Sequence, residues 1–262
     1  MKFCRFAPGH STIADSVSAL HGLIEEEHVR EISGPPWGQW SQATRIWPLQ
    51  DVRLLSPAEP GKIVCIGRNY AAHAAELGND VPSEPLMFLK PPSSVIGPED
   101  RIVLTRYSQQ VEHECELAVM MGKRCSKLAE ADDPLDYVLG YTCVNDVTAR
   151  DLQKRDVQFT RAKGFDTFCP LGPHIETGID PANVVVEAFV NGAVRQSANT
   201  SQMIFPVAFL IRWISQMMTL EPGDVIATGT PAGVGPLNAG DVVEVKVGGV
   251  GVLRNPVHAP QP

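Results

Sequence analysis

Short apolar segments separated by turn residues make up most of this chain after residue 60. Seven of them are rich in β-branched or aliphatic residues and are bounded by glycine, proline, asparagine or aspartate; they cover residues 62–67, 86–90, 114–122, 137–146, 183–192, 224–229 and 241–253. Such segments are typical of β-strands. Because they do not alternate regularly with helical segments, the pattern predicts an α+β fold dominated by strands rather than a doubly wound sheet.

The first 56 residues differ from the rest of the chain. The stretch "PPWGQW" interrupts them, and the segments on either side are short and weakly periodic. We therefore expect a small N-terminal β-rich subdomain over residues 1–56. The stretch "LLSPAEPGK" would join it to a main domain over residues 57–262.

The chief helix candidate is "PVAFLIRWISQMMTL", residues 206–220. Pro206 suits a first helical turn, and the following "EPGD" suits a helix end. Its apolar face is broad, and core packing explains it better than a cofactor site does.

Composition excludes several classes of protein. The net charge of −8 argues against nucleic acid as a partner. No apolar stretch of the sequence is long enough for a signal peptide or a membrane span, so we expect a cytoplasmic protein. The six cysteines form no CxxC pair and are expected to be free thiols rather than zinc or redox sites.

Three glutamates stand at alternate positions in "VEHECELAVMMG", residues 111–122. On a strand, residues two apart point to one face, so Glu114 and Glu116 would lie side by side. At about 4 Å and an effective dielectric of about 20 their repulsion costs about 4 kcal/mol, which a cation between them would reverse. The alternative is an exposed edge with a solvated acidic face. The apolar run that follows favours the buried interpretation, where unpaired charge is not tolerated.

A third oxygen ligand is expected from Asp146, which ends the apolar segment "GYTCVND". The alternative role for Asp146 is a cap for the helix that would start at "VTARDLQ". Three carboxylates without a Cys or His cluster make a hard oxygen site, which favours Mg²⁺ or Mn²⁺ over Zn²⁺.

Eight motifs in consecutive order over about residues 60–256 closely resemble the fumarylacetoacetate hydrolase family. The likeness is to its acylpyruvase and 2-hydroxyhepta-2,4-diene-1,7-dioate isomerase branch. The motifs are "IGRNYAAHAAELG", "PLMFLKPPSSVIG", "VEHECELAVMMGK", "GYTCVNDVTARDLQ", "AKGFDTFCPLGP", "VNGAVRQSANTSQMIF", "MTLEPGDVIATGTPAGVG" and "LNAGDVVEVKVGGVG". The resemblance implies mixed β-sheets rolled around a buried site, as in the family's C-terminal domain, and a homodimer. Residues 57–262 would then be the metal-binding catalytic domain.

The resemblance also assigns roles to individual residues. It implies a divalent metal held by Glu114, Glu116 and Asp146, with Glu112 outside the ligand set, either behind the ligands or on the surface. It marks Lys163, Gln153 and Thr230 as substrate contacts, with Lys163 placing a cation near a developing enolate. Arg68 and Lys90 are further candidates for substrate binding or lid closure, and the alternative for both is a solvated surface charge. Cys115, Cys169 and His174 depart from the commoner pattern; none replaces a ligand, and they bear only on pocket shape.

His73 and Glu76 lie three residues apart in "NYAAHAAELG", which its alanines predict to be a short helix ended by Gly78. The pair would share a helix face, and Glu76 would orient His73 as a general base. The alternative is a surface pair on a mobile segment. The resemblance favours the catalytic role, because family members with C–C hydrolase activity carry such a pair on a lid.

The implied substrates are 2-oxo acids with a second carbonyl group or a conjugated chain. Their carboxylate and 2-oxo oxygen can chelate the metal, which stabilises an enolate at C3. We expect hydrolysis of the C–C bond of an acylpyruvate-type 2,4-dioxo acid, because a His-Glu pair suits activation of water. The alternative is an isomerase or decarboxylase of a related 2-oxo acid, such as 5-carboxymethyl-2-hydroxymuconate isomerase, 2-hydroxyhepta-2,4-diene-1,7-dioate isomerase or oxaloacetate decarboxylase. A third alternative is a non-catalytic, metal-stabilised binding protein, which loss of a ligand, of Lys163 or of His73 would have indicated.

Overall fold

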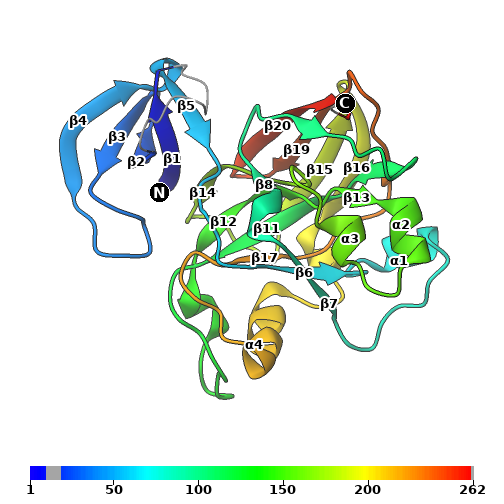
Figure 1. Cartoon of the computed structure of the whole chain (residues 1–262). Helices are drawn as coiled ribbons and strands as arrows, with labels where there is room; N and C mark the ends of the chain where they lie inside the picture. The colour runs from blue at the N-terminus through cyan, green and yellow to red at the C-terminus, as the bar shows by residue number, and fades with distance from the viewer. Residues whose placement is uncertain (10–18, 261–262) are drawn as a thin grey trace.

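The computed structural model describes residues 1–9 and 19–260, and strands predominate in it (Figure 1). The largest sheet contains β1 (Lys2–Pro8), β2 (Leu20–Glu25), β3 (His28–Ile32), β4 (Gln42–Pro48), β5 (Val52–Leu55), β6 (Ile63–Gly67), β7 (Leu86–Lys90), β8 (Val95–Ile96), β11 (Cys115–Met121), β12 (Val138–Asn145), β14 (Cys169–Glu176) and β17 (Val225–Ala227). Its order is β4-β3-β2-β1-β14-β12-β11-β17-β6-β7, with β5 beside β1 and β8 beside β14.

The remaining strands form two smaller sheets. One has the order β16-β15-β19-β20-β9 and the other β13-β10-β18. Their strands are β9 (Ile102–Val103), β10 (Val111–His113), β13 (Thr148–Ala149), β15 (Val185–Val190), β16 (Ala193–Asn199), β18 (Gly235–Pro236), β19 (Val242–Val247) and β20 (Gly251–His258). Parallel and antiparallel pairs occur together, so the predicted strand-dominated α+β fold with mixed sheets is confirmed.

The helices are few and short. They are α1 (Ala71–Glu76), α2 (Arg150–Arg155), α3 (Thr160–Lys163) and α4 (Val207–Met217), with 3₁₀ turns at Leu49–Asp51, Pro92–Ser94, Pro134–Tyr137 and Thr200–Gln202. In Figure 1, α1, α2 and α3 lie together at one end of the large sheet, away from β1–β5. Among the described residues, no helix is long and apolar enough to cross a membrane.

All seven predicted strand segments contain strands, but the last was predicted as one segment and is a hairpin. Residues 241–253 divide between β19 and β20, which pair antiparallel around a turn. Gly249 in this turn has a φ of +80°, a conformation that favours glycine.

The helix predicted at residues 206–220 is shorter than expected. Pro206 lies outside it as the N-cap, and the helix ends at Met217. The reason is a backbone pairing, because Leu220 and Cys125 exchange hydrogen bonds of 2.9 Å and draw this end of the segment into an extended conformation. The apolar face itself is as predicted, with Leu210, Ile211 and Ile214 buried in the core.

Strand β11 runs through the middle of the core and has no solvated face. Its odd residues, such as Leu117 and Val119, pack in a cluster with α4 and the five-stranded sheet, whereas Ala118 and Met120 pack on the opposite side. A strand buried on both faces reads as a continuous apolar run. Glu116 belongs to the same strand, so its carboxylate is placed inside the protein.

The N-terminal strands extend the large sheet and have a small core of their own. Strand β1 pairs with β14 through Lys2↔Glu176 and Phe3↔Ile175, and the side chains of Cys4 and Phe6 lie in a separate apolar cluster. We retain the division at residue 56 as a proposal, which the end of β5 at Leu55 supports.

Candidate metal and substrate site

Glu114 lies at a break between two strands. Strand β10 ends at His113 and belongs to the three-stranded sheet, whereas β11 begins at Cys115 and belongs to the large sheet. The continuous strand predicted through this segment is therefore wrong at Glu114, because the chain changes sheets there. The backbone is held by β12: the N–H of Glu114 donates to Asn145 Oδ1 at 3.0 Å, and the N–H of Asp146 donates to the Glu114 carbonyl at 2.9 Å.

The break does not separate the predicted ligands. Because Cys115 pairs with Asn145 in the β11–β12 ladder, the end of β12 lies beside the start of β11. One carboxylate oxygen from each of Glu114, Glu116 and Asp146 lies within 4.8 Å of the others, and all three residues are at most 5% exposed. The acidic face is therefore buried rather than solvated.

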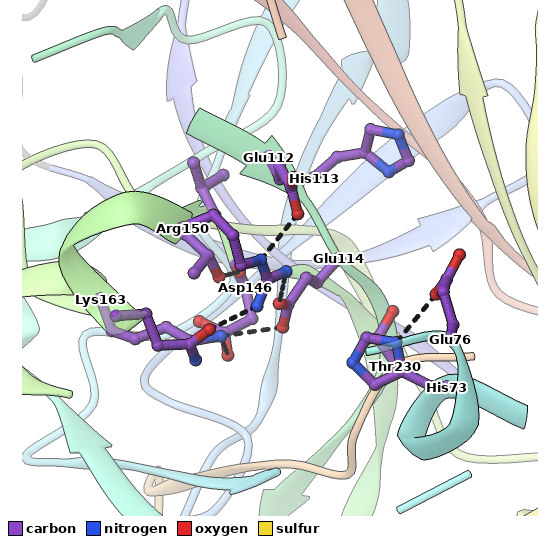
Figure 2. Close-up of polar contacts among 12 residues, drawn as sticks. His73, Glu76, Glu112, His113, Glu114, Asp146, Arg150, Lys163 and Thr230 are labelled. Carbon is purple, nitrogen blue, oxygen red and sulfur yellow. Dashed lines mark hydrogen bonds and ion pairs between the residues drawn. The ribbon is translucent and has the colours of Figure 1, made fainter. Parts of the chain in front are cut away.

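Two lysines pair with two of these carboxylates. Lys163, at the end of α3, donates from Nζ to Glu114 Oε2 at 2.8 Å and to Asp146 Oδ2 at 2.5 Å (Figure 2). Lys90 donates from Nζ to Asp146 Oδ1 at 2.6 Å. Both lysines are buried, so Lys90 is not the solvated charge considered as its alternative.

Arg150, the first residue of α2, was not predicted as a site residue. Its guanidinium donates to Glu112 Oε2 at 2.7 Å and also pairs with Glu114 (Figure 2). Glu112 is 5% exposed, so it lies behind the ligands rather than on the surface. The sequence alone gives no signal for Arg150, because the burial of the acids that it pairs with is seen only in the folded chain.

Glu116 is the carboxylate without a cationic partner among the described residues. It accepts a hydrogen bond of 2.7 Å from the N–H of Gly229. Burial and then the carboxylates of Asp146 and Glu114 raise the pKa of Glu116 well above its ordinary value. Burial alone would also raise the pKa of Glu114, but Lys163 and Arg150 outweigh it and hold that pKa far below the usual range.

The residues fit a divalent cation. Four buried carboxylates face three buried cationic side chains, which leaves one negative charge uncompensated, and that excess is centred on Glu116; the seven residues are Glu112, Glu114, Glu116, Asp146, Lys90, Arg150 and Lys163. A small doubly charged ion among Glu114, Glu116 and Asp146 would offset it. Carboxylate oxygens are the ligands that Mg²⁺ and Mn²⁺ prefer.

The three acids open onto a cavity of about 460 Å³. Nine of the ten residues predicted for the site line it: Arg68, His73, Glu76, Glu114, Glu116, Asp146, Gln153, Lys163 and Thr230. The tenth, Lys90, lies behind Asp146. The three residues that depart from the family pattern, Cys115, Cys169 and His174, are not part of the lining.

His73 and Glu76 lie on α1, the short helix that was predicted, and Gly78 follows it with a φ of +67°. His73 Nδ1 and Glu76 Oε2 are 3.2 Å apart (Figure 2), and Glu76 Oε1 accepts a 2.9 Å hydrogen bond from the N–H of Gly233. Since a carboxylate only accepts, His73 Nδ1 carries the proton and Nε2 is the basic nitrogen. His73 is 4% exposed, so the pair is not on a free surface.

Thr230 lines the cavity, but its hydroxyl is already engaged. It donates to the carbonyl of Cys115 at 2.9 Å and accepts from Gln196 Nε2 at 2.7 Å. A substrate carboxylate has no proton to give, so it can bond to this hydroxyl only if the bond to Cys115 breaks. The predicted contact of Thr230 with substrate therefore stays a prediction.

Gln196, on β16, joins the strand that carries the ligands to the glycine-rich loop. Its Oε1 accepts from the N–H of Cys115 and from His113 Nδ1, each at 3.0 Å, and its Nε2 donates to Thr230 and to the Pro231 carbonyl at 2.7 Å. The side chain is 1% exposed. Sequence reasoning missed it, because its partners are more than 30 residues away along the chain.

Gln196→Leu is expected to destabilise the protein by about 2–4 kcal/mol, because it leaves the N–H of Cys115 and the carbonyl of Pro231 buried without partners. Metal affinity should fall by about tenfold or more, since Cys115 stands between Glu114 and Glu116, two of the three predicted ligands. Urea unfolding and metal titration measure the two effects. A variant equal to the wild type in both would show that Gln196 does not support the site.

Two family profiles match the chain, one in each of its two parts. The profile described as fumarylacetoacetate (FAA) hydrolase C-terminal matches residues 62–258, and the profile described as Rv2993c-like, N-terminal, matches residues 1–57. Protein Rv2993c of Mycobacterium tuberculosis is 46% identical over 260 residues, which are 98% of each chain.

Two further relatives carry names that state a reaction. Mitochondrial oxaloacetate tautomerase FAHD2A of Bos taurus is 45% identical over 225 residues, or 81% of this chain and 71% of its own. The crystal structure of 2-hydroxyhepta-2,4-diene-1,7-dioate isomerase from Mycobacterium marinum is 44% identical, covers 100% of both chains and superposes with a TM-score of 0.88.

Proposed function

This chain belongs to the fumarylacetoacetate hydrolase family, and on that premise we propose that it is a divalent-metal-dependent isomerase or tautomerase of a 2-oxo acid. The observation that carries the proposal is the buried convergence of Glu114, Glu116 and Asp146 at a cavity large enough for a small acid. Mg²⁺ or Mn²⁺ would be held by these three residues.

The choice of isomerisation over hydrolysis rests on the relatives rather than on the sequence motifs alone. The sequence favoured C–C hydrolysis, with isomerisation or decarboxylation as the alternative. A tautomerase and an isomerase are 44–45% identical to this chain and cover most or all of it, which favours the alternative. We also propose that the protein is a homodimer and is cytoplasmic, as predicted from the sequence.

When bound, a divalent ion polarises the 2-oxo group and so favours enolate formation at C3. Lys163 adds a fixed positive charge beside it. Burial would lower the pKa of Lys163, but Asp146 and Glu114 outweigh burial and raise it, so the ammonium keeps its proton. Two of its three N–H donors reach Glu114 and Asp146, and the third is available to the oxygen on which negative charge develops.

His73 is the residue suited to move the proton. Glu76 fixes its Nδ1–H, which leaves Nε2 as a base on a side chain that lines the cavity. Transfer of a proton between C3 and an enol oxygen needs such a base and no attacking water.

Hydrolysis of an acylpyruvate-type 2,4-dioxo acid is the second candidate. The observation that favours it is the same His73–Glu76 pair, because Nε2 could equally take a proton from water. The two reactions share the enolate and differ in whether water reaches C4.

Rates on two substrates distinguish these functions. We expect kcat/KM for ketonisation of enol-oxaloacetate, measured above the spontaneous rate, to exceed kcat/KM for pyruvate release from acetylpyruvate by about 100-fold or more with either Mg²⁺ or Mn²⁺. Chelation of the metal should abolish both reactions. The reverse ratio would make hydrolysis the function, and no metal-dependent turnover of either substrate would contradict the proposal.

His73→Ala is expected to lower kcat/KM for the faster reaction by about 10²–10⁴-fold, the usual worth of a positioned general base. Metal affinity should change little, because His73 forms no hydrogen bond or ion pair with the three acids. Steady-state kinetics and calorimetric metal titration measure the two effects. Full activity in the variant would exclude His73 as the base.

A further inference from the structure

Beyond the acid cluster, the cavity lining includes apolar walls and two further cations. The apolar members are Ile66, Leu77, Leu86, Phe88 and Phe159. The two cations are Arg68, which is half-buried, and Lys154, which is exposed. The ligand carboxylates are at most 5% exposed, so the two cations lie nearer the solvent end of the cavity.

Among the residues that the structure describes, Arg68 and Lys154 have no carboxylate partner, unlike Arg150 and Lys163. Arg150 and Lys163 are neutralised by buried acids. Over residues 1–9 and 19–260, neither Arg68 nor Lys154 forms an ion pair or a side-chain hydrogen bond. Their charges are therefore available to a ligand.

The position of Lys154 follows from α2. Arg150 and Lys154 are four residues apart, so they share one face of the helix. Arg150 points into the acid cluster, and Lys154 lies about 6 Å further along the helix axis at 1.5 Å per residue. The cation of Lys154 is thus set back from the metal ligands by about one helical turn.

Arg68 is held by an unusual backbone conformation. Its φ of +56° is one that residues with a side chain rarely adopt. Asn69 fixes it, donating from Nδ2 to the carbonyls of Phe205 and Thr228 at 3.0 and 2.7 Å and accepting at Oδ1 from the N–H of Phe205 at 2.8 Å. The direction in which Arg68 leaves the backbone is therefore set by the fold.

The charges of the lining suit a doubly negative ligand. Arg68, Arg150, Lys154 and Lys163 balance Glu76, Glu114, Glu116 and Asp146. A divalent cation adds two positive charges, which a dianion cancels and a monoanion does not.

We propose that Arg68 and Lys154 bind the distal carboxylate of a dicarboxylic 2-oxo acid whose head lies at Glu114, Glu116 and Asp146. This inference rests on the proposed function, since it assumes that the head binds at the three acids. It adds two specificity residues to that function.

The test compares two ligands that cannot enolise. N-oxalylglycine and N-ethyloxamate share an oxalyl head and differ in a terminal carboxylate that is replaced by methyl. Calorimetry on the full chain with Mg²⁺ gives the dissociation constant of each. We expect the wild type to bind N-oxalylglycine about tenfold more tightly, Arg68→Gln and Lys154→Gln each to lower this preference by about threefold, and the double variant to remove it.

The variants are matched for structure. Glutamine and arginine both carry a Cβ and are unbranched there, so the left-handed backbone at residue 68 costs the same in each. Glutamine and lysine have similar helix propensities at position 154. Arg155→Gln removes a neighbouring charge of α2 that is not part of the lining, and it should leave the preference unchanged.

Two results would overturn the inference. Equal affinity for the two ligands in the wild type, or a preference that survives in the double variant, would show that the distal carboxylate is not recognised by these cations. If neither ligand binds in the presence of Mg²⁺, the proposed function itself fails, because both ligands carry the head that it requires.

Discussion

Glu116→Gln is expected to abolish divalent-metal binding and turnover while leaving the metal-free protein at least as stable as the wild type. Glutamine keeps the shape of the side chain and can still accept the hydrogen bond from Gly229. It removes one of three anionic ligands. Since loss of groups outside a coordination sphere costs about 10–100-fold in affinity, loss of a ligand should cost at least about 100-fold. Metal polarisation worth several kcal/mol corresponds to about 10³-fold in rate.

The stability of this variant should depend on pH in a defined direction. Burial and the neighbouring carboxylates raise the pKa of Glu116 in the folded state. The metal-free native state therefore binds a proton that the unfolded state releases above about pH 4.5, so the contribution of Glu116 to wild-type stability falls as pH rises from there. Glu116→Gln does not lose stability in this way, so its stability relative to the wild type should increase between pH 5 and pH 8.

Calorimetric titration with Mg²⁺ and Mn²⁺, together with thermal unfolding of the metal-free protein across this pH range, checks both expectations. Glu114→Ala is a poorer test, although it should also lose metal and activity, because it removes one of the two carboxylate partners of Lys163 and one of the two of Arg150. Metal-dependent turnover in Glu116→Gln at the wild-type level would show that the ion is not held by this residue.

The sequence was sufficient to predict that Glu114, Glu116 and Asp146 form a buried acidic cluster, because the signal of the two glutamates is local. Glu114 and Glu116 lie within one short segment, and the apolar residues after them predict burial. The short α1 helix was equally readable from its alanines and Gly78. The strand break at Glu114 was not, because alternation looks the same in a strand that continues and in one that passes to another sheet.

The supporting residues were beyond prediction for a different reason. Gln196 lies on β16 between exposed neighbours, and its bonds to Cys115 and Thr230 span 81 and 34 residues. Only the folded chain brings these groups together. Arg150 was hidden by its setting in "TARDLQ", where a basic residue at a helix start resembles a solvated charge.

Arg150→Met is expected to lower the free energy of unfolding by about 3–5 kcal/mol at pH 7, because it leaves two buried carboxylates without their shared cation. Methionine retains the aliphatic length of the side chain, so the decrease in the free energy of unfolding measures the effect of removing the charge. In the wild type, Lys163 and Arg150 hold the pKa of Glu114 down. That pairing stabilises the fold above about pH 4.5, the ordinary value for glutamate, and is lost as pH falls. The deficit of the variant should therefore be full at pH 7 and should shrink below pH 4.5.

Two further variants separate charge from packing in this prediction. Arg155→Met removes an exposed arginine of the same helix, whose contact with Asp156 is 3.8 Å, and should change stability by less than about 0.5 kcal/mol. Glu112→Gln added to Arg150→Met removes one of the two carboxylates that lose their shared cation and should recover about half of the loss, since these residues form one network. Urea unfolding of the wild type and the three variants measures each change in the free energy of unfolding. If Arg150→Met were no more destabilising than Arg155→Met, the buried acids could not depend on Arg150, and the metal ligands would have to be held in place by Lys163 and Lys90 alone.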